Sequence, residues 1–328
     1  MRIFSGIRAS GEKTLGNYSG GYRQYVAMQE QGDGVFCIVD LHSITTAYEP
    51  EGLHEATLAG AAMLFATGLD PERSIVFAQS HVKAHAEAAW LLSAVTSYGE
   101  LRRMTQFKDK AADQDFVTSG LFEYPVLMAG DILLYQTDIV PIGDDQRQHL
   151  ELTRNVAERF NSRYGETFTV PTGVYPEEGA RVKNLQEPER LMSTSAGNPH
   201  GVVRIVDEPH VIRKKFKTAV TDSEREIRHD PSSKAGISNL LEIMSVATGE
   251  SVGAIEARYD GAGYGQFKED VGEAIVALFE PVQERYRALR ADEPGLRALL
   301  ADGAERAREA SRPTLEAMYE RMGFVRPS

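Results

Sequence analysis

A single carboxylate inside an apolar stretch is the side chain with the most distinctive chemistry. Asp131 lies in the run MAGDILLY, with hydrophobic residues on both sides. Burying a carboxylate costs free energy unless a hydrogen-bond donor meets it. Asp131 therefore predicts either a buried acceptor for a ligand, or a helix carboxylate that points to solvent or pairs with an arginine.

Glycines follow the first apolar segment, at Gly6, Gly11 and Gly16. Glycine lets the backbone approach a phosphate closely, and the amides that open a following helix attract anions. The spacing is neither GxGxxG nor a P-loop, which counts against a dinucleotide site and an ordinary NTPase site. On spacing alone, a glycine-rich turn without a ligand is the better interpretation.

His42 directly follows a β-branched segment, residues 35–39, and the acidic Asp40. A lone histidine in such a place is more often structural than catalytic. Ligands of parallel sheets bind beyond the carboxyl ends of the strands, which favours a role for His42 in a site.

The elements that would position these residues alternate between strands and helices. Short buried segments predict strands, and helical spacing of apolar residues predicts helices. The expected strands cover residues 3–6, 35–39, 74–78 and 138–143. One expected helix begins near residue 18, and three others cover residues 51–69, 81–104 and 146–164. This alternation predicts βαβ units in a Rossmann-like, doubly wound parallel sheet, an α/β fold. Beyond a polar loop near residue 190, helical patterns predict an all-helical C-terminal domain.

Composition sets the broad class. The chain has 328 residues, 42% hydrophobic, enough for a large domain with a smaller one. We expect no transmembrane helix and no secretory signal, and therefore a cytoplasmic protein. Cys37 is the only cysteine, which excludes an internal disulfide and disfavours a Cys-built metal site. The net charge of −12 argues against non-specific nucleic-acid binding, so a specific nucleic-acid partner would need a local basic surface.

Several short blocks of sequence run in order along nearly the whole chain. They are FSG at 4–6, TLGN at 14–17, IVDLH at 38–42, MTQFK at 104–108, GDILLY at 130–135, IGDDQRQH at 142–149 and AVTDS at 219–223. Together they resemble the bacterial-type tryptophanyl-tRNA synthetases, a family of class I aminoacyl-tRNA synthetases. Thr14-Leu15-Gly16-Asn17 resembles the TxGN form of the family's HIGH signature. The resemblance implies that L-tryptophan is activated with ATP and Mg²⁺ to tryptophanyl-adenylate and pyrophosphate, and is then transferred to tRNA(Trp).

The resemblance also implies a tryptophan site in which Asp131 accepts the indole N–H. A pocket built around one required hydrogen bond rejects analogues that lack it by about 10⁴-fold or more. His42 would lie near the amino acid's carboxylate and Gln146 near its ammonium. The implied site comprises Phe4, Gly6, His42, Tyr124, Met128, Asp131 and Gln146. For Phe4 and Met128, an ordinary core position is an equally good interpretation.

The implied ATP site lies on the glycine-rich turn and on a second signature loop. Thr14 and Asn17 would donate to ATP, and Gly16 would leave room for the nucleotide. The implied ATP-binding residues are Arg8, Ser10, Thr14, Gly16, Asn17, Gly143, Asp145, Met192, Ser193 and Ser195, and the implied catalytic residues are Lys110, Ser193 and Thr194. Lys110 could equally be a solvated charge beside Asp109.

The clearest departure from the family is at Leu191-Met192-Ser193-Thr194-Ser195, where the family has KMSKS. The family's lysines meet the triphosphate and stabilise the departing pyrophosphate, and here Leu191 and Thr194 occupy both lysine positions. Arg190 and the Thr194 hydroxyl could keep part of the phosphate contact. Arg8 stands where the family usually has a neutral residue, and its charge could offset part of the loss.

The resemblance divides the chain into three functional parts. These are a Rossmann-like catalytic domain at 1–187, whose region 80–140 forms a homodimer interface, the signature loop at 188–200, and a helical tRNA anticodon-binding domain at 201–328. The basic run Arg213–Lys217 is either a solvated helix face or a phosphate-binding surface for tRNA.

Three alternatives remain open at this point. A tyrosyl-tRNA synthetase would share the class, although Asp131 and the TxGN form count against it. A tryptophan- or tRNA-binding paralogue with little catalysis would explain the lost lysines. A specialised second copy that resists a tryptophan-mimicking inhibitor would keep the enzyme activity.

Overall fold

The chain forms two compact units. The computed structural model describes residues 1–9, 12–112, 116–143, 146–175, 182–193 and 198–325. Unit 1 comprises Met1–Ser10, Tyr25–Tyr175 and Leu289–Ser328, and unit 2 comprises Gly11–Gln24 and Pro176–Ala288. The boundaries expected after residues 187 and 200 divide the chain by function, into a catalytic domain, a signature loop and an anticodon-binding domain. This functional division stays a prediction.

Unit 1 contains a sheet of five parallel strands within the described residues. The strands are β1 (Arg2–Ile7), β2 (Asp33–Ile38), β3 (Ile75–Ala78), β4 (Ile139–Pro141) and β5 (Thr172–Val174), in the spatial order β3-β2-β1-β4-β5. The chain runs outward on both sides of the central β1, which is the doubly wound arrangement with a switch point between β1 and β4. The Rossmann-like fold expected from the sequence is therefore confirmed.

Both faces of the sheet are buried, as the continuous apolar character of the strands requires. Val35 and Cys37 of β2 join a core with Phe4 of β1 and Phe77 of β3. The alternate residue Phe36 contacts the ring of Tyr25, with centroids 5.4 Å apart. The side chains on both faces of the sheet are therefore buried. A ligand can then meet the loops only at the edge where the strands end, which in parallel sheets is the carboxyl edge.

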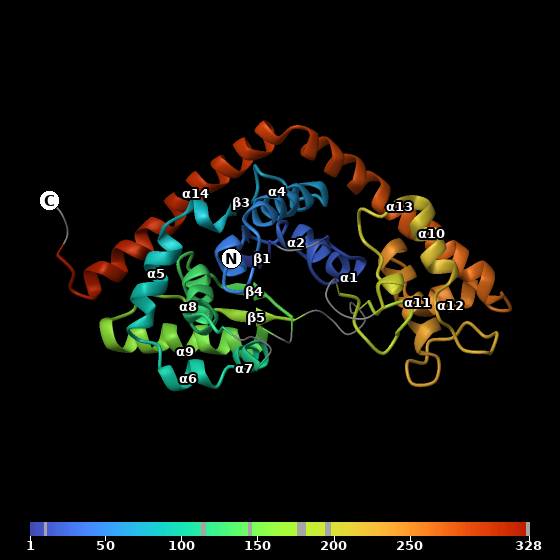
Figure 1. Ribbon diagram of the computed structural model, residues 1–328, viewed down its shortest axis with the longest axis horizontal. Coiled ribbons are helices and arrows are strands. Elements are labelled where there is room, and N and C mark those ends of the chain that lie inside the picture. Colours follow the sequence, from blue (N-terminus) through green and yellow to red (C-terminus); the bar gives the residue numbers. More distant parts are fainter. Residues whose placement is uncertain (10–11, 113–115, 144–145, 176–181, 194–197, 326–328) are drawn as a thin grey trace. The chain divides into compact units, whose positions relative to one another are not determined.

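Helices of unit 1 cover this sheet (Figure 1). They are α3 (Asp40–Ser43), α4 (Pro50–Ala66), α5 (Ala84–Ser93), α6 (Tyr98–Arg102), α7 (Thr105–Ala112), α8 (Ser119–Leu133), α9 (Arg147–Tyr164) and α14 (Glu293–Arg321). Although α14 comes last in the chain, it packs on β3: a Cβ at Gly303 would lie only 1.9 Å from the Val76 carbonyl oxygen. The glycine is needed for that approach.

The continuous helix expected over 81–104 is wrong. After a 3₁₀ turn, Gln79–His81, α5 ends at Ser93, and α6 begins after Ser97. Ser97 and Glu100 form a capping box that opens α6. Such a box satisfies amides that a continuous helix would satisfy with carbonyls one turn earlier, so a new helix starts there.

Unit 2 is helical, as expected for the region beyond the signature loop. Its elements include α1 (Leu15–Asn17), a π-helical turn Tyr18–Tyr22, the start of α2 (Arg23–Met28), a 3₁₀ turn Pro199–Gly201, α10 (Pro209–Lys217), α11 (Ala235–Thr248), α12 (Val252–Arg258) and most of α13 (Tyr264–Ala291). Phe216 of α10 and Phe267 of α13 are fully buried in it. In the described residues, none of the helices has the combination of length and hydrophobicity that crossing a bilayer needs.

Candidate active site

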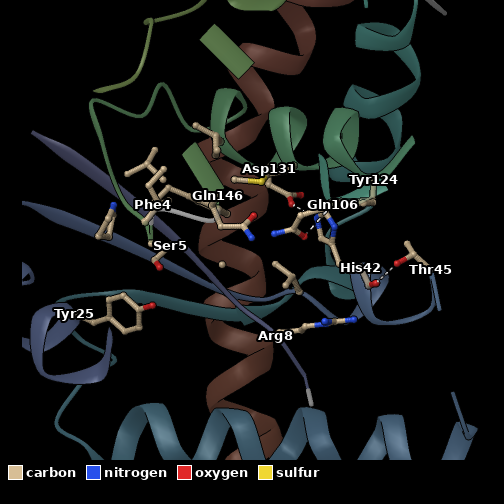
Figure 2. Close-up of a pocket in the computed structure, with 18 residues that line it drawn as sticks. Phe4, Ser5, Arg8, Tyr25, His42, Thr45, Gln106, Tyr124, Asp131 and Gln146 are labelled. Carbon is tan, nitrogen blue, oxygen red and sulfur yellow. Dashed lines mark hydrogen bonds and ion pairs between the residues drawn. The ribbon is translucent and has the colours of Figure 1, made fainter. Parts of the chain in front are cut away.

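A cavity of about 320 Å³ opens in unit 1 where the parallel strands end. Residues that follow β1, β2 and β4 line it, together with side chains from α8 (Figure 2). The volume is that of a small-molecule site. Most walls are apolar: Phe4, Val39, Met128, Ile132, Val140, Pro141 and Ile142.

One face of α8 supplies the end of the cavity. Tyr124, Met128 and Asp131 all line it. Their spacing of four and then three residues puts them on one stripe of the helix, because residues three or four apart share a face. Asp131 is only 1% exposed, which excludes the solvent-facing alternative considered for it.

Asp131 is held by three side-chain donors. Its Oδ1 accepts hydrogen bonds from Gln79 Nε2 at 2.6 Å and from His85 Nδ1 at 2.6 Å. Its Oδ2 is 2.7 Å from His42 Nε2. Each carboxylate oxygen offers about two acceptor positions, so within the described residues Oδ1 is filled and Oδ2 keeps one position. A ligand in the cavity with a single N–H donor fits that position.

The charge state of Asp131 follows from its neighbours. Burial disfavours the ionised carboxyl, but the charge and hydrogen bonds of His42 and His85 outweigh burial and lower the pKa of Asp131 to about 2. The group is therefore an anion at neutral pH and only accepts hydrogen bonds.

A second layer fixes His85. Its Nδ1 faces the Asp131 carboxylate, and its Nε2 lies 2.9 Å from the hydroxyl of Tyr135. Burial, followed by the charges of Cys37 and Asp131, raises the pKa of Tyr135 well above its usual range, so the hydroxyl keeps its proton. The two ring nitrogens of His85 are therefore both engaged, one with the Asp131 carboxylate and one with the tyrosine hydroxyl. The Tyr135 ring also stacks on Phe4, 5.8 Å between centroids, which joins this layer to the cavity wall.

The network has an internal cost at Gln79. Its amide nitrogen donates to Asp131, and its carbonyl oxygen is buried without a partner among the described residues. An unpaired buried carbonyl is unfavourable. The amide nevertheless keeps this orientation because the ionised carboxylate takes the donor.

The cavity also has polar lining residues. They include Gln146, Gln106 and Arg8, and His42 packs edge-on to the ring of Tyr124. The Tyr124 hydroxyl is 2.8 Å from Nε2 of the buried His149. Amide and hydroxyl groups there suit the ammonium and carboxylate of an amino acid better than an apolar group.

The TxGN segment lies in unit 2 and is held by its own hydrogen bonds. Thr14 caps α1: its hydroxyl accepts from the Asn17 amide, and Asn17 Oδ1 accepts from the Thr14 amide at 2.9 Å. Thr14 is fully buried and Asn17 is exposed. In this arrangement Thr14 orients Asn17, an exposed residue whose side-chain amide nitrogen could meet a ligand.

The signature loop packs directly against this segment. A Cβ at Gly16 would lie 2.5 Å from the carbonyl oxygen of Met192, so glycine is needed here for the approach of the loop backbone. The Leu15 amide donates to the Val203 carbonyl at 2.8 Å, and the Val203 amide meets the Met192 sulfur at 3.4 Å. Before any ligand is considered, the two signature segments therefore form one packed structure.

The residues expected from the sequence separate into three sets. All of the expected tryptophan-binding residues line the unit 1 cavity, together with Arg8 and Gly143 from the ATP set. Thr14, Gly16, Asn17, Met192 and Ser193 belong to unit 2. Ser10, Asp145, Thr194 and Ser195 lie outside the described residues, and Lys110 is in α7 with its side chain outside the description.

Sequence reasoning missed Gln79, His85 and Tyr135. Gln79 follows a buried strand, the position that singled out His42, and that signal could have found it. His85 and Tyr135 sit within helical patterns that give no sign of a ligand site. Only the contact between α5 and α8 brings them to Asp131.

Comparison with known proteins identifies the family of the chain. The model of the family described as tRNA synthetases class I (W and Y) matches residues 1–280. The chain therefore belongs to this class I synthetase family, whose members serve tryptophan and tyrosine.

Within the family, the similarity is to proteins named for tryptophan. A tryptophan–tRNA ligase of Leifsonia xyli is 49% identical over 100% of this chain and 98% of the relative. Tryptophanyl-tRNA synthetase of Mycoplasma pneumoniae has a similar structure, with a TM-score of 0.90, 35% identity and coverage of 99% and 98% of the two chains. The enzyme of Campylobacter jejuni, in complex with ADP and tryptophan, matches with a TM-score of 0.86, 35% identity and coverage of 99% and 100%.

Proposed function

We propose that this protein activates L-tryptophan with ATP and transfers it to tRNA(Trp). The observation that carries the proposal is the buried Asp131 carboxylate, which keeps one acceptor position in an otherwise apolar cavity, in a chain similar over its full length to tryptophan–tRNA ligases. Indole has one N–H donor, and a carboxylate held by three other donors matches it.

The indole would lie between Phe4 and Met128, with its N–H on Asp131 Oδ2. Gln146 would meet the ammonium of the substrate and His42 its carboxylate, since both side chains line the same cavity. Since Asp131 does not move when it is already bonded to Gln79, His85 and His42, little ordering cost remains for binding.

ATP would bind at the two signature segments, with Mg²⁺ entering as a counter-ion of its phosphates. Asn17 and Ser193 of unit 2 would hold the nucleotide there. The tryptophan carboxylate oxygen attacks the α-phosphorus, the bond to the β,γ-phosphates breaks, and pyrophosphate leaves. The 3′-terminal ribose of the tRNA then displaces AMP from the adenylate. No residue needs to form a covalent intermediate, so catalysis rests on positioning and on charge near the phosphates.

Tryptophan-dependent ATP–pyrophosphate exchange tests this function directly. We expect exchange with tryptophan and at most about 10⁻⁴ of that efficiency with tyrosine, because each pocket is built around a different donor. Exchange that prefers tyrosine would assign the chain to the other branch of the family. Tryptophan binding without any exchange would favour a binding paralogue.

We propose further that the protein is a cytoplasmic homodimer that uses region 80–140. This part of unit 1 has large exposed apolar side chains: Trp90 is 77% exposed, Tyr98 68% and Phe116 80%. A hollow lined by Trp90, Leu41 and Ile44 lies beside them. Exposed apolar surface of this kind is typical of a protein–protein interface. Light scattering of wild type and of Trp90→Glu would test it, with a fall to monomer mass expected in the variant.

A further inference from the structure

The signature loop has Leu191 and Thr194 where the family has lysines, and the strand that pairs with Leu191 carries Lys183. We propose that Lys183 is the phosphate-binding cation of the ATP site, presented across a short antiparallel pair from Leu191. This inference rests on the proposed function, because it assigns a residue to the ATP site of that reaction.

The pairing places residue 183 beside residue 191. Lys183 and Leu191 form an antiparallel bridge. The hydrogen bonds lie on either side of it: the Asn184 amide donates to the Arg190 carbonyl at 2.9 Å, and the Met192 amide donates to the Val182 carbonyl at 3.0 Å. Lys183 and Leu191 are thus a non-hydrogen-bonded pair, whose side chains project from one face with Cβ atoms about 4.5–5.5 Å apart.

A buried asparagine fixes Lys183 from the opposite edge. Asn239 of α11 accepts from the Lys183 amide at 2.9 Å, and its side-chain nitrogen donates to the Lys183 carbonyl at 3.0 Å. Asn239 is only 2% exposed, so both bonds are protected from water. The backbone that carries Lys183 is therefore held on both sides, which reduces the ordering cost of any contact that its side chain makes.

The ion pairs of the neighbouring arginines leave the Lys183 ammonium able to bind a phosphate. The nearby Arg190 guanidinium faces Glu187 at 3.8 Å, and Arg204 is bound to Glu12 at 2.8 Å. Lys183 is half-buried, and its ammonium makes no ion pair with a carboxylate of the described residues. Leu191 opposite it is 55% exposed and offers an apolar surface for the lysine stem while the ammonium stays in water.

The strand pair is also next to the TxGN segment. Met192, the neighbour of Leu191, has its carbonyl against Gly16, close enough to exclude a Cβ there. Phosphates bound between Asn17 and the loop would therefore lie within reach of a long side chain that projects beside residue 191. A lysine at residue 183 could therefore contact the same phosphates as a lysine at residue 191.

The test is to move the lysine by mutation from residue 183 to residue 191 on the paired strand. Lys183→Met keeps the length and removes the charge, and we expect it to slow single-turnover tryptophanyl-adenylate formation about ten- to a hundredfold, the usual value of a charge-assisted contact. The KM for ATP should rise and the KM for tryptophan should not. Adding Leu191→Lys to Lys183→Met should restore most of the rate, because the ammonium returns to the same face.

Two controls separate the possible roles. Arg225→Met removes one exposed positive charge of unit 2 that is not part of the strand pair and should leave the rate unchanged. Lys183→Arg should stay active, and unfolding temperatures should show that Lys183→Met is folded. A rate for Lys183→Met within twofold of an active wild type would overturn the assignment, and so would a loss that Leu191→Lys cannot restore. A wild type without any exchange would instead overturn the proposed function.

Discussion

The cavity of unit 1 and the strand pair of Lys183 and Leu191 in unit 2 use charge in opposite ways. Asp131 is 1% exposed and is fixed by Gln79, His85 and His42, while the cation assigned to the phosphates is half-buried and carried by a strand. A buried acceptor must match one donor in position, so it cannot be moved to another residue. A solvated cation acts on a diffuse anion and can be replaced from a neighbouring strand.

Removing the buried acceptor should have the largest effect. Asp131→Ala leaves the indole N–H without a partner, and His42 and His85 without theirs, which should cost about 2–4 kcal/mol in kcat/KM for tryptophan. The KM for ATP should change little, because the phosphate contacts lie elsewhere. Exchange assays with varied tryptophan and varied ATP measure the two effects, and an indifferent variant would contradict the role of Asp131.

The same carboxylate should make stability depend on acid. Its pKa is lowered in the folded protein to about 2 from 3.8, so its ionised form stabilises the fold above pH 4, and that contribution is lost as the pH falls toward 2. The linked free energy is about 2 kcal/mol. The difference in unfolding free energy between wild type and Asp131→Asn should therefore shrink by that amount from pH 5 to pH 2 in denaturant titrations. A constant difference would mean that the pKa is not lowered.

The second layer should matter less than the acceptor itself. Tyr135→Phe removes the hydroxyl that is hydrogen-bonded to His85 Nε2 and keeps the ring that stacks on Phe4, so we expect about a tenfold loss of discrimination, close to one net hydrogen bond. The informative readout is the preference for tryptophan over 3-benzothienylalanine, which has the same shape and no N–H. A variant that is merely less stable would lose activity toward both amino acids and keep their ratio.

The architecture could largely be predicted from the sequence, because each strand and helix has its own periodicity. Strand β5, Thr172–Val174, was missed: three residues without an apolar run give no signal, and only pairing with β4 defines them. The break between α5 and α6 was missed because the capping Ser97 lies within a longer apolar pattern.

The site was predicted unevenly. Asp131 is conspicuous because its sequence neighbours are apolar, whereas His85 becomes a site residue only through packing between helices distant in sequence. Contacts between helices also decide which lysines of the basic run, Arg213–Lys217, are exposed. Lys215 is bound to Asp207 at 2.6 Å and Arg213 to Glu273 at 2.6 Å, so Lys214 and Lys217 are the lysines of the run that remain exposed.

These two lysines define a smaller, tRNA-specific effect. If they touch phosphates, Lys214→Ala with Lys217→Ala should weaken tRNA binding a fewfold and reduce its salt dependence by about one unit for each contact. Pyrophosphate exchange should stay at the wild-type rate, since the activation site is separate. Binding measured from low to moderate salt gives the slope, and an unchanged slope would mean that this surface of α10 is only solvated. Lys215 is left intact because breaking its pair with Asp207 would disturb the fold.

The smallest effect should come from restoring the family's lysine at position 194. An ammonium beside the β,γ-phosphates is worth about ten- to a hundredfold in rate where no other cation serves them. If Lys183 already serves them, a second ammonium adds little, because the first has neutralised the charge that it would meet. We therefore expect Thr194→Lys to change the rate of adenylate formation by less than about threefold in the wild type, and about tenfold in Lys183→Met. Single-turnover rates of the wild type, the two single variants and the double variant form a double-mutant cycle. The coupling free energy of this cycle measures how far positions 183 and 194 act on the same phosphates. Equal gains in both backgrounds would mean that the two lysines act on different phosphates, and a large gain in the wild type would mean that the signature loop is deficient as it stands.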